Sequence, residues 1–267
     1  MIELMSGVVT ITLADHVADV RLNRPDKMNA VDPAMWRALS DAGELLGETK
    51  GVRAVVLTGN GRAFCAGLDM ATFATMGGAD KPDLETQRGS AVGGTAAPRP
   101  GNVFQRAALV WKRLPVPVIA ALHGVAFGAG AQIALGADIR IAGPDLRLSI
   151  LEIKWGLIPD CGITQTLRDV VSLDVAKELT FTGRIVKADE ALSLGLVTQL
   201  AEDPLAHAKV LAREIASKSP DAIRFGKQLL DAAWHADEAT GLALEAKLQS
   251  RLIGSTNQQE AIRANFE

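Results

Sequence analysis

One order of elements recurs along the chain: a short apolar strand, a turn that contains glycine, a helix, and a further strand. Residues 116–124 (VPVIAALHG) have the composition of a buried strand, residues 124–130 (GVAFGAG) that of a turn, and a helix is expected from about Ala129. The next strand is residues 138–143 (DIRIAG). Strands that alternate with helices in this way predict an α/β fold whose parallel strands are covered on both faces.

The N-terminal part predicts a hairpin and a capped helix. In residues 8–23 (VVTITLADHVADVRLN), β-branched residues alternate with others on either side of a turn at residues 14–16. Asp32 and Pro33 then have the types preferred at the N-cap and first turn of a helix, which we expect to run to about Glu48. Two further elements are expected before residue 116, a strand at residues 53–59 and a helix at residues 103–113.

From about Asp203 onward the apolar pattern is helical only. We therefore expect an α/β core over residues 1–200 and a C-terminal helical subdomain over residues 201–267. Residues 76–101 are rich in Gly, Ala and Pro and have no apolar period. That segment is either a solvated linker or a flap over a binding site.

Charge and composition exclude several classes of partner. The net charge of −3 gives no basic surplus for nucleic acid or an anionic membrane. No apolar run approaches about 18 residues, so we expect a cytoplasmic protein with no membrane partner. Cys65 and Cys161 lack metal-ligand spacing and are expected to be small core residues, although a disulfide stays open. The four histidines are not spaced as metal ligands, so we expect no metal.

Two glycine-containing turns follow predicted strands. Residues 59–69 (GNGRAFCAGLD) form one and residues 124–130 the other. Each turn places backbone N–H groups at the mouth of a parallel sheet, and two converging N–H donors are what an oxyanion needs. The alternative is that the glycines only permit tight turns.

Two acids lie in residues 149–162 (SILEIKWGLIPDCG). Glu152 stands between apolar neighbours, so burial is expected to raise its pKa toward the range useful for proton transfer. Its alternative is a buried ion pair with an arginine or with Lys154, which strand alternation would place on the same face. Asp160 follows a proline, and by itself it is best interpreted as the N-cap of a helix.

Taken together, the ordered motifs of this chain closely resemble those of the crotonase, or enoyl-CoA hydratase/isomerase, superfamily. The resemblance covers roughly residues 7–267 and implies a crotonase-like α/β spiral of repeated ββα units with C-terminal helices. The motifs that carry it are LNRPDKMNAV, RAFCAGLDM, PVPVIAALHGVAFGAGAQIALGADIRIA, LEIKWGLIPDCGITQTL and ELTFTGRIVKADEALSLGLVTQL.

The resemblance implies an acyl-CoA substrate and no separate cofactor, since coenzyme A is part of that substrate. Two backbone N–H groups would form the oxyanion hole for the thioester oxygen, and by matching position these belong to Leu68 and Ala129. The family usually has glycine at the second position, and the methyl group of alanine would narrow the pocket. The implied contacts with coenzyme A are Lys27, Ala30, Ala63, Ala66 and Asp69, with Lys227 near the CoA phosphates. The family also commonly forms trimers, or dimers of trimers, through the C-terminal helices.

The resemblance also separates the reactions within the family. Hydratases have glutamates at the positions of Gln132 and Glu152, and an amide can orient water but cannot carry its proton. Dienoyl-CoA isomerases have the acidic pair found here as Glu152 and Asp160, together with an acid at position 132. Dehalogenases of the family have a tryptophan where Glu152 stands, which argues against that reaction.

We therefore expect an enzyme that works through a thioester enolate, with Glu152 as the main acid/base. Asp160 is the expected second proton carrier or electrostatic partner, and Gln132 a positioning residue. The expectation favours double-bond isomerisation over hydration by Glu152 alone. The remaining alternative is an acyl-CoA-binding paralogue without catalysis.

Overall fold

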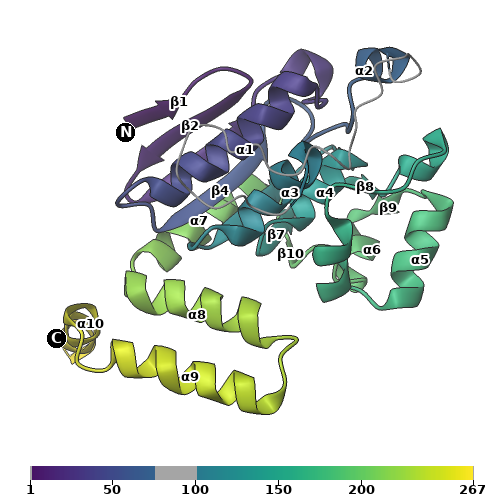
Figure 1. Ribbon diagram of the computed structural model, residues 1–267. Coiled ribbons are helices and arrows are strands. Elements are labelled where there is room, and N and C mark those ends of the chain that lie inside the picture. The colour runs from purple at the N-terminus through teal and green to yellow at the C-terminus, as the bar shows by residue number, and fades with distance from the viewer. Residues whose placement is uncertain (1, 76–100, 267) are drawn as a thin grey trace.

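The computed structural model describes residues 2–75 and 101–266, and its largest sheet has seven strands (Figure 1). Their order across the sheet is β1-β2-β3-β4-β5-β7-β10. The strands are β1 (Ile2–Met5), β2 (Val9–Ala14), β3 (Val17–Leu22), β4 (Ala54–Gly59), β5 (Val118–Leu122), β7 (Ile139–Ala142) and β10 (Gln199–Leu200).

The predicted hairpin is present. β2 and β3 pair in antiparallel register from Val9 opposite Leu22 to Ala14 opposite Val17. The two turn residues, Asp15 and His16, both have positive φ, which matches the twist that a two-residue hairpin turn requires. From β3 to β10 each neighbouring pair is parallel, as the alternation of strands and helices predicts.

Helices cover both faces of this sheet, as predicted. α1 (Pro33–Glu48), α3 (Val103–Arg113) and α4 (Ala129–Leu135) pack with one face, and α7 (Pro204–Ala216) covers the other. The alternation along β4 shows this division: Val55 and Leu57 join the larger core cluster, whereas Ala54 and Val56 join the alanine side chains of α7. Asp32 caps α1 through a 2.8 Å hydrogen bond from the Met35 N–H, as expected.

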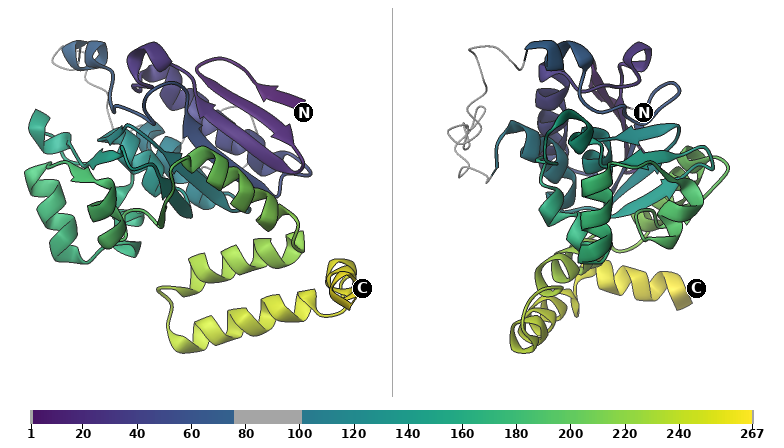
Figure 2. Two further views of the ribbon diagram at one scale, coloured as in Figure 1. Left: turned by 180° about the vertical axis from the view of Figure 1, so that it is seen from behind. Right: turned by 90° about the vertical axis from the view of Figure 1, so that its right-hand side faces the viewer.

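A second sheet of three short strands stands beside the end of the first, in the order β6-β8-β9. It consists of β6 (Val125–Phe127), β8 (Arg147–Ser149) and β9 (Val186–Lys187). The helices α5 (Leu173–Thr182) and α6 (Ala188–Ser193) lie next to it (Figures 1 and 2). The short helices around the two sheets are η1 (Pro25–Lys27), α2 (Met70–Thr75), η2 (Glu152–Trp155), η3 (Ile163–Gln165) and η4 (Leu167–Asp169).

The last three helices extend away from the core (Figure 2). They are α8 (Pro220–Ala233), α9 (Glu238–Leu252) and α10 (Thr256–Phe266). α7 belongs with the sheet by its packing, so the extended part begins with α8 rather than at residue 201. Several apolar side chains on these helices or directly after them are exposed, namely Leu230, Trp234, Leu242, Ile253, Ile262 and Phe266.

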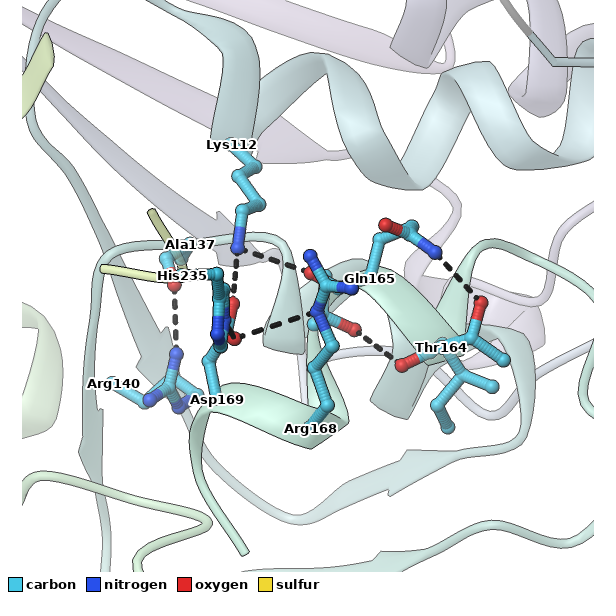
Figure 3. A network of polar contacts seen from close by, with 10 residues as sticks. Lys112, Ala137, Arg140, Thr164, Gln165, Arg168, Asp169 and His235 are labelled. Carbon is cyan, nitrogen blue, oxygen red and sulfur yellow. Dashed lines mark hydrogen bonds and ion pairs between the residues drawn. The ribbon is translucent and has the colours of Figure 1, made fainter. Parts of the chain in front are cut away.

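Polar contacts hold α8 to the core at its middle and just beyond its C-terminal end. Lys227 donates to Asp138 at 2.7 Å and to the Val116 carbonyl at 3.2 Å. Just beyond α8, His235 contacts Asp169 at 2.7 Å, and Asp169 also bonds Lys112 of α3 (Figure 3). These contacts fix the direction in which the C-terminal helices leave the core.

Two sequence predictions are wrong in local structure. Glu152 is not in a strand: it begins the short helix η2, because β8 ends at Ser149 where its pairing with β6 ends. Lys154 consequently does not pair with Glu152 but lies over the Trp155 ring. Asp160 is not an N-cap, since the next short helix starts at Ile163 with Gly162 at its cap position.

The prediction of a linker or flap at residues 76–101 falls almost wholly outside the described residues. Both cysteines are free and buried, so they are core residues and no disulfide joins them. None of the described helices is long and apolar enough to cross a membrane.

Candidate active site

The two glycine-containing turns lie side by side at the carboxyl ends of β4 and β5. The Cys65 N–H donates to the Val125 carbonyl, and the Phe127 N–H donates to the Cys65 carbonyl, each at 3.0 Å. Gly67 approaches the second turn closely: a Cβ added there would stand 2.7 Å from the Phe127 carbonyl oxygen and 3.9 Å from the Ala129 nitrogen. A side chain at position 67 would therefore force the two turns apart.

Each turn contains one of the two backbone N–H groups expected to form the oxyanion hole. In the bridge between Val31 and Leu68, the bonds run from the Val31 N–H to Gly67 and from the Asp69 N–H to Val31. The Leu68 N–H therefore points away from Val31. Ala129 is the first residue of α4, where a helix leaves its N–H groups unpaired. Two such donors on adjoining turns are suited to binding an oxyanion.

Glu152 stands against the second turn. A Cβ added to Gly128 would lie 3.2 Å from Glu152 Oε1, so the carboxylate occupies the space that the glycine leaves. Oε1 accepts a 2.6 Å hydrogen bond from Gln132 Nε2. Oε2 is buried and has no hydrogen-bond partner within the described residues. A buried, unpaired carboxylate oxygen is costly to the fold and is available for a proton.

Gln132 connects the two segments that carry the acids. Its side chain is 1 % exposed, and its Oε1 accepts a 2.9 Å hydrogen bond from the Cys161 backbone N–H while its Nε2 donates to Glu152. An ionised glutamate could accept from Cys161 but could not donate to Glu152. The amide thus suits this position for a structural reason as well as a chemical one.

The surroundings of Glu152 and Asp160 favour their neutral forms. Burial raises the pKa of Glu152, and the negative charge of Asp160 raises it further. The backbone N–H of Glu152 itself, the Gln132 amide and the backbone of Leu151 oppose this rise. Burial also raises the pKa of Asp160, whose side-chain contact is the weak Cys161 thiol at 3.7 Å. The same burial and the two neighbouring carboxylates raise the pKa of Cys161, so this thiol is a poor nucleophile.

The residues expected to contact coenzyme A gather beside the first turn. The Ala66 N–H donates to Met28 at 2.9 Å, which joins the segment that contains Lys27 and Ala30 to the turn. Lys27 is exposed, Ala66 is partly exposed, and Ala30 and Ala63 are buried. Asp69 pairs with Arg24 at 2.9 Å, which lowers the pKa of Asp69 after the larger effect of the Ala71 N–H.

Lys227 does not lie where the family resemblance implies, near the CoA phosphates. Its ammonium is buried in an ion pair with Asp138, and its side chain is 8 % exposed. That contact is structural, and the ammonium is not free to meet a phosphate.

Three contacts of the site had no signal in the sequence. They are the Cys161 N–H on Gln132, the approach of Gly128 to Glu152, and Arg24 beside Asp69, a residue 45 positions away. Of the aromatic side chains near these turns, Phe64 and Trp111 are fully buried core, whereas Trp155 is 42 % exposed and stacks on Phe73. Within residues 2–75 and 101–266, no group of three or more His, Cys, Asp or Glu could hold a metal ion.

Comparison with known proteins identifies the family. Residues 12–267 match the family model described as enoyl-CoA hydratase/isomerase. The chain belongs to this family. Its α/β core with C-terminal helices is the crotonase fold, and the family's substrates are acyl-CoA thioesters.

Relatives within the family carry out different reactions. The short-chain-enoyl-CoA hydratase of Clostridium acetobutylicum is 34% identical over 94% of this chain and 91% of its own length. The mitochondrial Delta(3,5)-Delta(2,4)-dienoyl-CoA isomerase of Mus musculus is 35% identical over 79% of this chain and 64% of its own. Among solved structures, the enoyl-CoA hydratase of Bacillus anthracis superposes with a TM-score of 0.84 at 29% identity, covering 97% of this chain and 95% of that one.

Proposed function

We propose that this family member isomerises the double bond of an enoyl-CoA thioester, with Glu152 as the principal acid/base. The observation that carries the proposal is that the two carboxylate oxygens of Glu152 differ in their hydrogen bonding. Oε1 is held by the Gln132 amide, and Oε2 is buried and unpaired. A carboxylate with one hydrogen-bonded oxygen and one unpaired oxygen is suited to taking a proton from a carbon acid.

The reaction begins when Glu152 Oε2 removes an α-proton from a 3-enoyl thioester. The electrons of the broken C–H bond move to the thioester carbonyl and form a dienolate. The dienolate oxygen accepts hydrogen bonds from the backbone N–H groups of Leu68 and Ala129. Burial raises the pKa of Asp160, which favours its protonated form, and in the proposed step protonated Asp160 delivers a proton to the γ-carbon. The product is the conjugated 2-enoyl thioester, and exchange of protons with water resets the two carboxyl groups.

Gln132 supports isomerisation over hydration. Water addition in the hydratases uses two glutamates, and here the amide of Gln132 is buried between Glu152 and Cys161. These contacts make Gln132 a support for the Glu152 carboxylate, and an amide cannot act as a general acid or base toward water at neutral pH.

We further propose that Lys27, Ala30, Ala63, Ala66 and Asp69 form the wall against which coenzyme A lies. The position of these residues beside the turn that carries Leu68 supports this proposal. The structural contacts of Asp69 with Arg24 indicate that it shapes this wall rather than binding the nucleotide itself. The exposed apolar side chains on α8–α10 support the further proposal of a homotrimer or hexamer assembled through a C-terminal helical part.

Incubation in deuterated water tests the reaction. The purified protein is given a 3-enoyl-CoA, a dienoyl-CoA and crotonyl-CoA separately, and the products are followed by mass spectrometry. We expect double-bond migration with deuterium uptake and little addition of water to crotonyl-CoA. Efficient hydration of crotonyl-CoA would instead assign the protein as a hydratase that uses Glu152 alone. Binding of all three thioesters without either reaction would show a non-catalytic binder.

A further inference from the structure

Arg24 lies at the base of the turn that carries the Leu68 N–H. Its guanidinium donates in two directions: Nη1 to the Ala30 carbonyl and Nη2 to Asp69 Oδ2 at 2.9 Å. A second carboxylate, Asp32, stands 3.4 Å from the same Nη2. The Arg24 side chain is only 18 % exposed, so these contacts are largely shielded from water.

The two acceptors of Arg24 flank the bridge that orients Leu68. Ala30 precedes Val31 on one side of this bridge, and Asp69 follows Leu68 on the other. The bridge itself has two hydrogen bonds, from Val31 to Gly67 at 2.7 Å and from Asp69 to Val31 at 3.0 Å. Since parallel pairing turns the Leu68 N–H away from Val31, a shift in this bridge would turn the N–H with it.

The far side of Asp69 is also fixed. Its Oδ1 accepts the Ala71 N–H at 2.9 Å at the start of α2, while its Oδ2 accepts from Arg24. The backbone of Arg24 is held as well, because its N–H donates to the buried Asn29 side chain at 2.9 Å. Arg24 therefore links two independently anchored pieces of backbone.

We propose that Arg24 is a positioning residue that fixes the direction of the Leu68 N–H toward the thioester oxygen. This inference rests on the oxyanion role proposed above for Leu68. A planar guanidinium can serve two acceptors at a fixed angle, which the ammonium of lysine cannot do in the same geometry. Misplacing a catalytic donor by about 1 Å can cost roughly 10²-fold in rate.

The neighbours of Arg24 argue against a direct role in binding the substrate. Asp69 and Asp32 already balance its charge, and its donors point at protein acceptors. Removing Arg24 should therefore lower kcat far more than it raises KM for the thioester.

A chromophoric ligand separates this role from a merely structural one. An arylacryloyl-CoA with an electron-donating para-dimethylamino group absorbs at longer wavelength when donors polarise its thioester carbonyl. The shift on binding is measured for the wild type, for Arg24→Met and for Arg24→Lys. Arg53→Met is the matched control, because Arg53 is partly buried and donates to the Ala216 carbonyl at 3.0 Å, at the end of β4 opposite to the turn. Thermal unfolding of each protein shows which variants are folded.

We expect a red shift for the wild type and for Arg53→Met, a much smaller one for Arg24→Met, and an intermediate one for Arg24→Lys. In Arg24→Met we expect kcat for isomerisation to fall roughly 10- to 100-fold, with KM changed less than about threefold. An unchanged shift and kcat in a folded Arg24 variant would overturn the proposal, and Arg24→Lys serves as that variant if Arg24→Met does not fold. Absence of any shift in the wild type would overturn the oxyanion role itself.

Discussion

Two clusters of acidic side chains in this molecule have opposite surroundings. Around Glu152 and Asp160 the structure provides burial, an amide, a thiol and a second carboxylate, and both pKa values are raised. Around Asp169 it provides Lys112, Arg168 and His235 (Figure 3). Burial opposes ionisation of Asp169, but hydrogen bonds from Lys112 and His235 and their charges outweigh it and lower its pKa.

The comparison shows how one residue type serves two purposes. Ionised Asp169 has cationic and hydrogen-bonding partners. It connects Lys112 of α3 to His235, just beyond α8, so its role is structural. Glu152 is left with an unpaired oxygen and no cation at hydrogen-bonding distance among the described residues, an arrangement that weakens the fold and suits proton transfer. Substitutions that neutralise each acid should therefore have contrasting effects.

The largest contrast is expected in activity. Glu152→Gln removes the proposed base and should lower isomerisation by roughly 10²- to 10⁴-fold. Asp169→Asn should leave the rate within about twofold, because Asp169 belongs to the anchor of α8. Steady-state rates on a 3-enoyl-CoA measure both, and equal losses in the two variants would contradict the distinction.

Asp160→Asn should have a smaller effect on turnover. The amide cannot deliver the proton to the γ-carbon, so we expect a loss of roughly 10²-fold in isomerisation. Removal of the α-proton by Glu152 should continue. The ratio of α-proton exchange to product formation, followed in deuterated water, should therefore rise; a fall in both rates together would place Asp160 outside the second step.

Gln132→Glu should change the choice of reaction and the pH profile. An ionised glutamate repels Glu152 and no longer donates to it, so the pKa of Glu152 should rise further. The acidic limb of the rate against pH should move upward, and water addition to crotonyl-CoA should increase relative to isomerisation. Gln165→Glu is the control, since Gln165 is exposed and, within the described part of the chain, its side chain bonds only its neighbour Thr164. An unchanged pH profile in Gln132→Glu would contradict the role of the amide.

The smallest contrast is expected in the free energy of unfolding at neutral pH, which should change in opposite directions in Glu152→Gln and Asp169→Asn. The raised pKa of Glu152 means that its contribution to stability is present below its unfolded value near 4.5 and is lost as pH rises through the folded value. Glu152→Gln should thus raise the melting temperature at pH 7–8 and have no effect at pH 4.

The lowered pKa of Asp169 gives the reverse dependence. Its contribution is present above the unfolded value near 3.8 and is lost as pH falls through the folded value. Asp169→Asn should therefore lower stability at pH 7 by up to about 1 kcal/mol, as for other partly exposed ion pairs. Thermal unfolding at several pH values measures both variants, and shifts of the same sign at pH 7 would contradict the comparison.

The parts of the fold that depend on local pattern could be predicted from the sequence. The hairpin turn, the Asp32 cap and the bounds of α3 each follow from residues close in the chain. The conformation at Glu152 could not, because β8 ends where its neighbours in the sheet end and not where the apolar alternation ends.

The candidate site shows the same limit. Burial of the carboxyl group of Glu152 was predicted from its apolar neighbours, and its relation to Asp160 and Gln132 from the family resemblance. The contacts that position these groups join residues far apart in the chain: Gln132 with Cys161, and Arg24 with Asp69. Such contacts depend on how the turns pack at the end of the sheet, and this packing cannot be predicted from a local sequence pattern.

Exchange of the α-protons of a saturated acyl-CoA tests the central claim most directly, because it needs only the base and the oxyanion donors. The thioester is incubated in deuterated water with the wild type, Glu152→Gln or Asp160→Asn, and deuterium incorporation is followed by mass spectrometry. The account predicts exchange with the wild type and with Asp160→Asn, and almost none with Glu152→Gln. Exchange by Glu152→Gln at the rate of the wild type, or no exchange by the wild type, would contradict it.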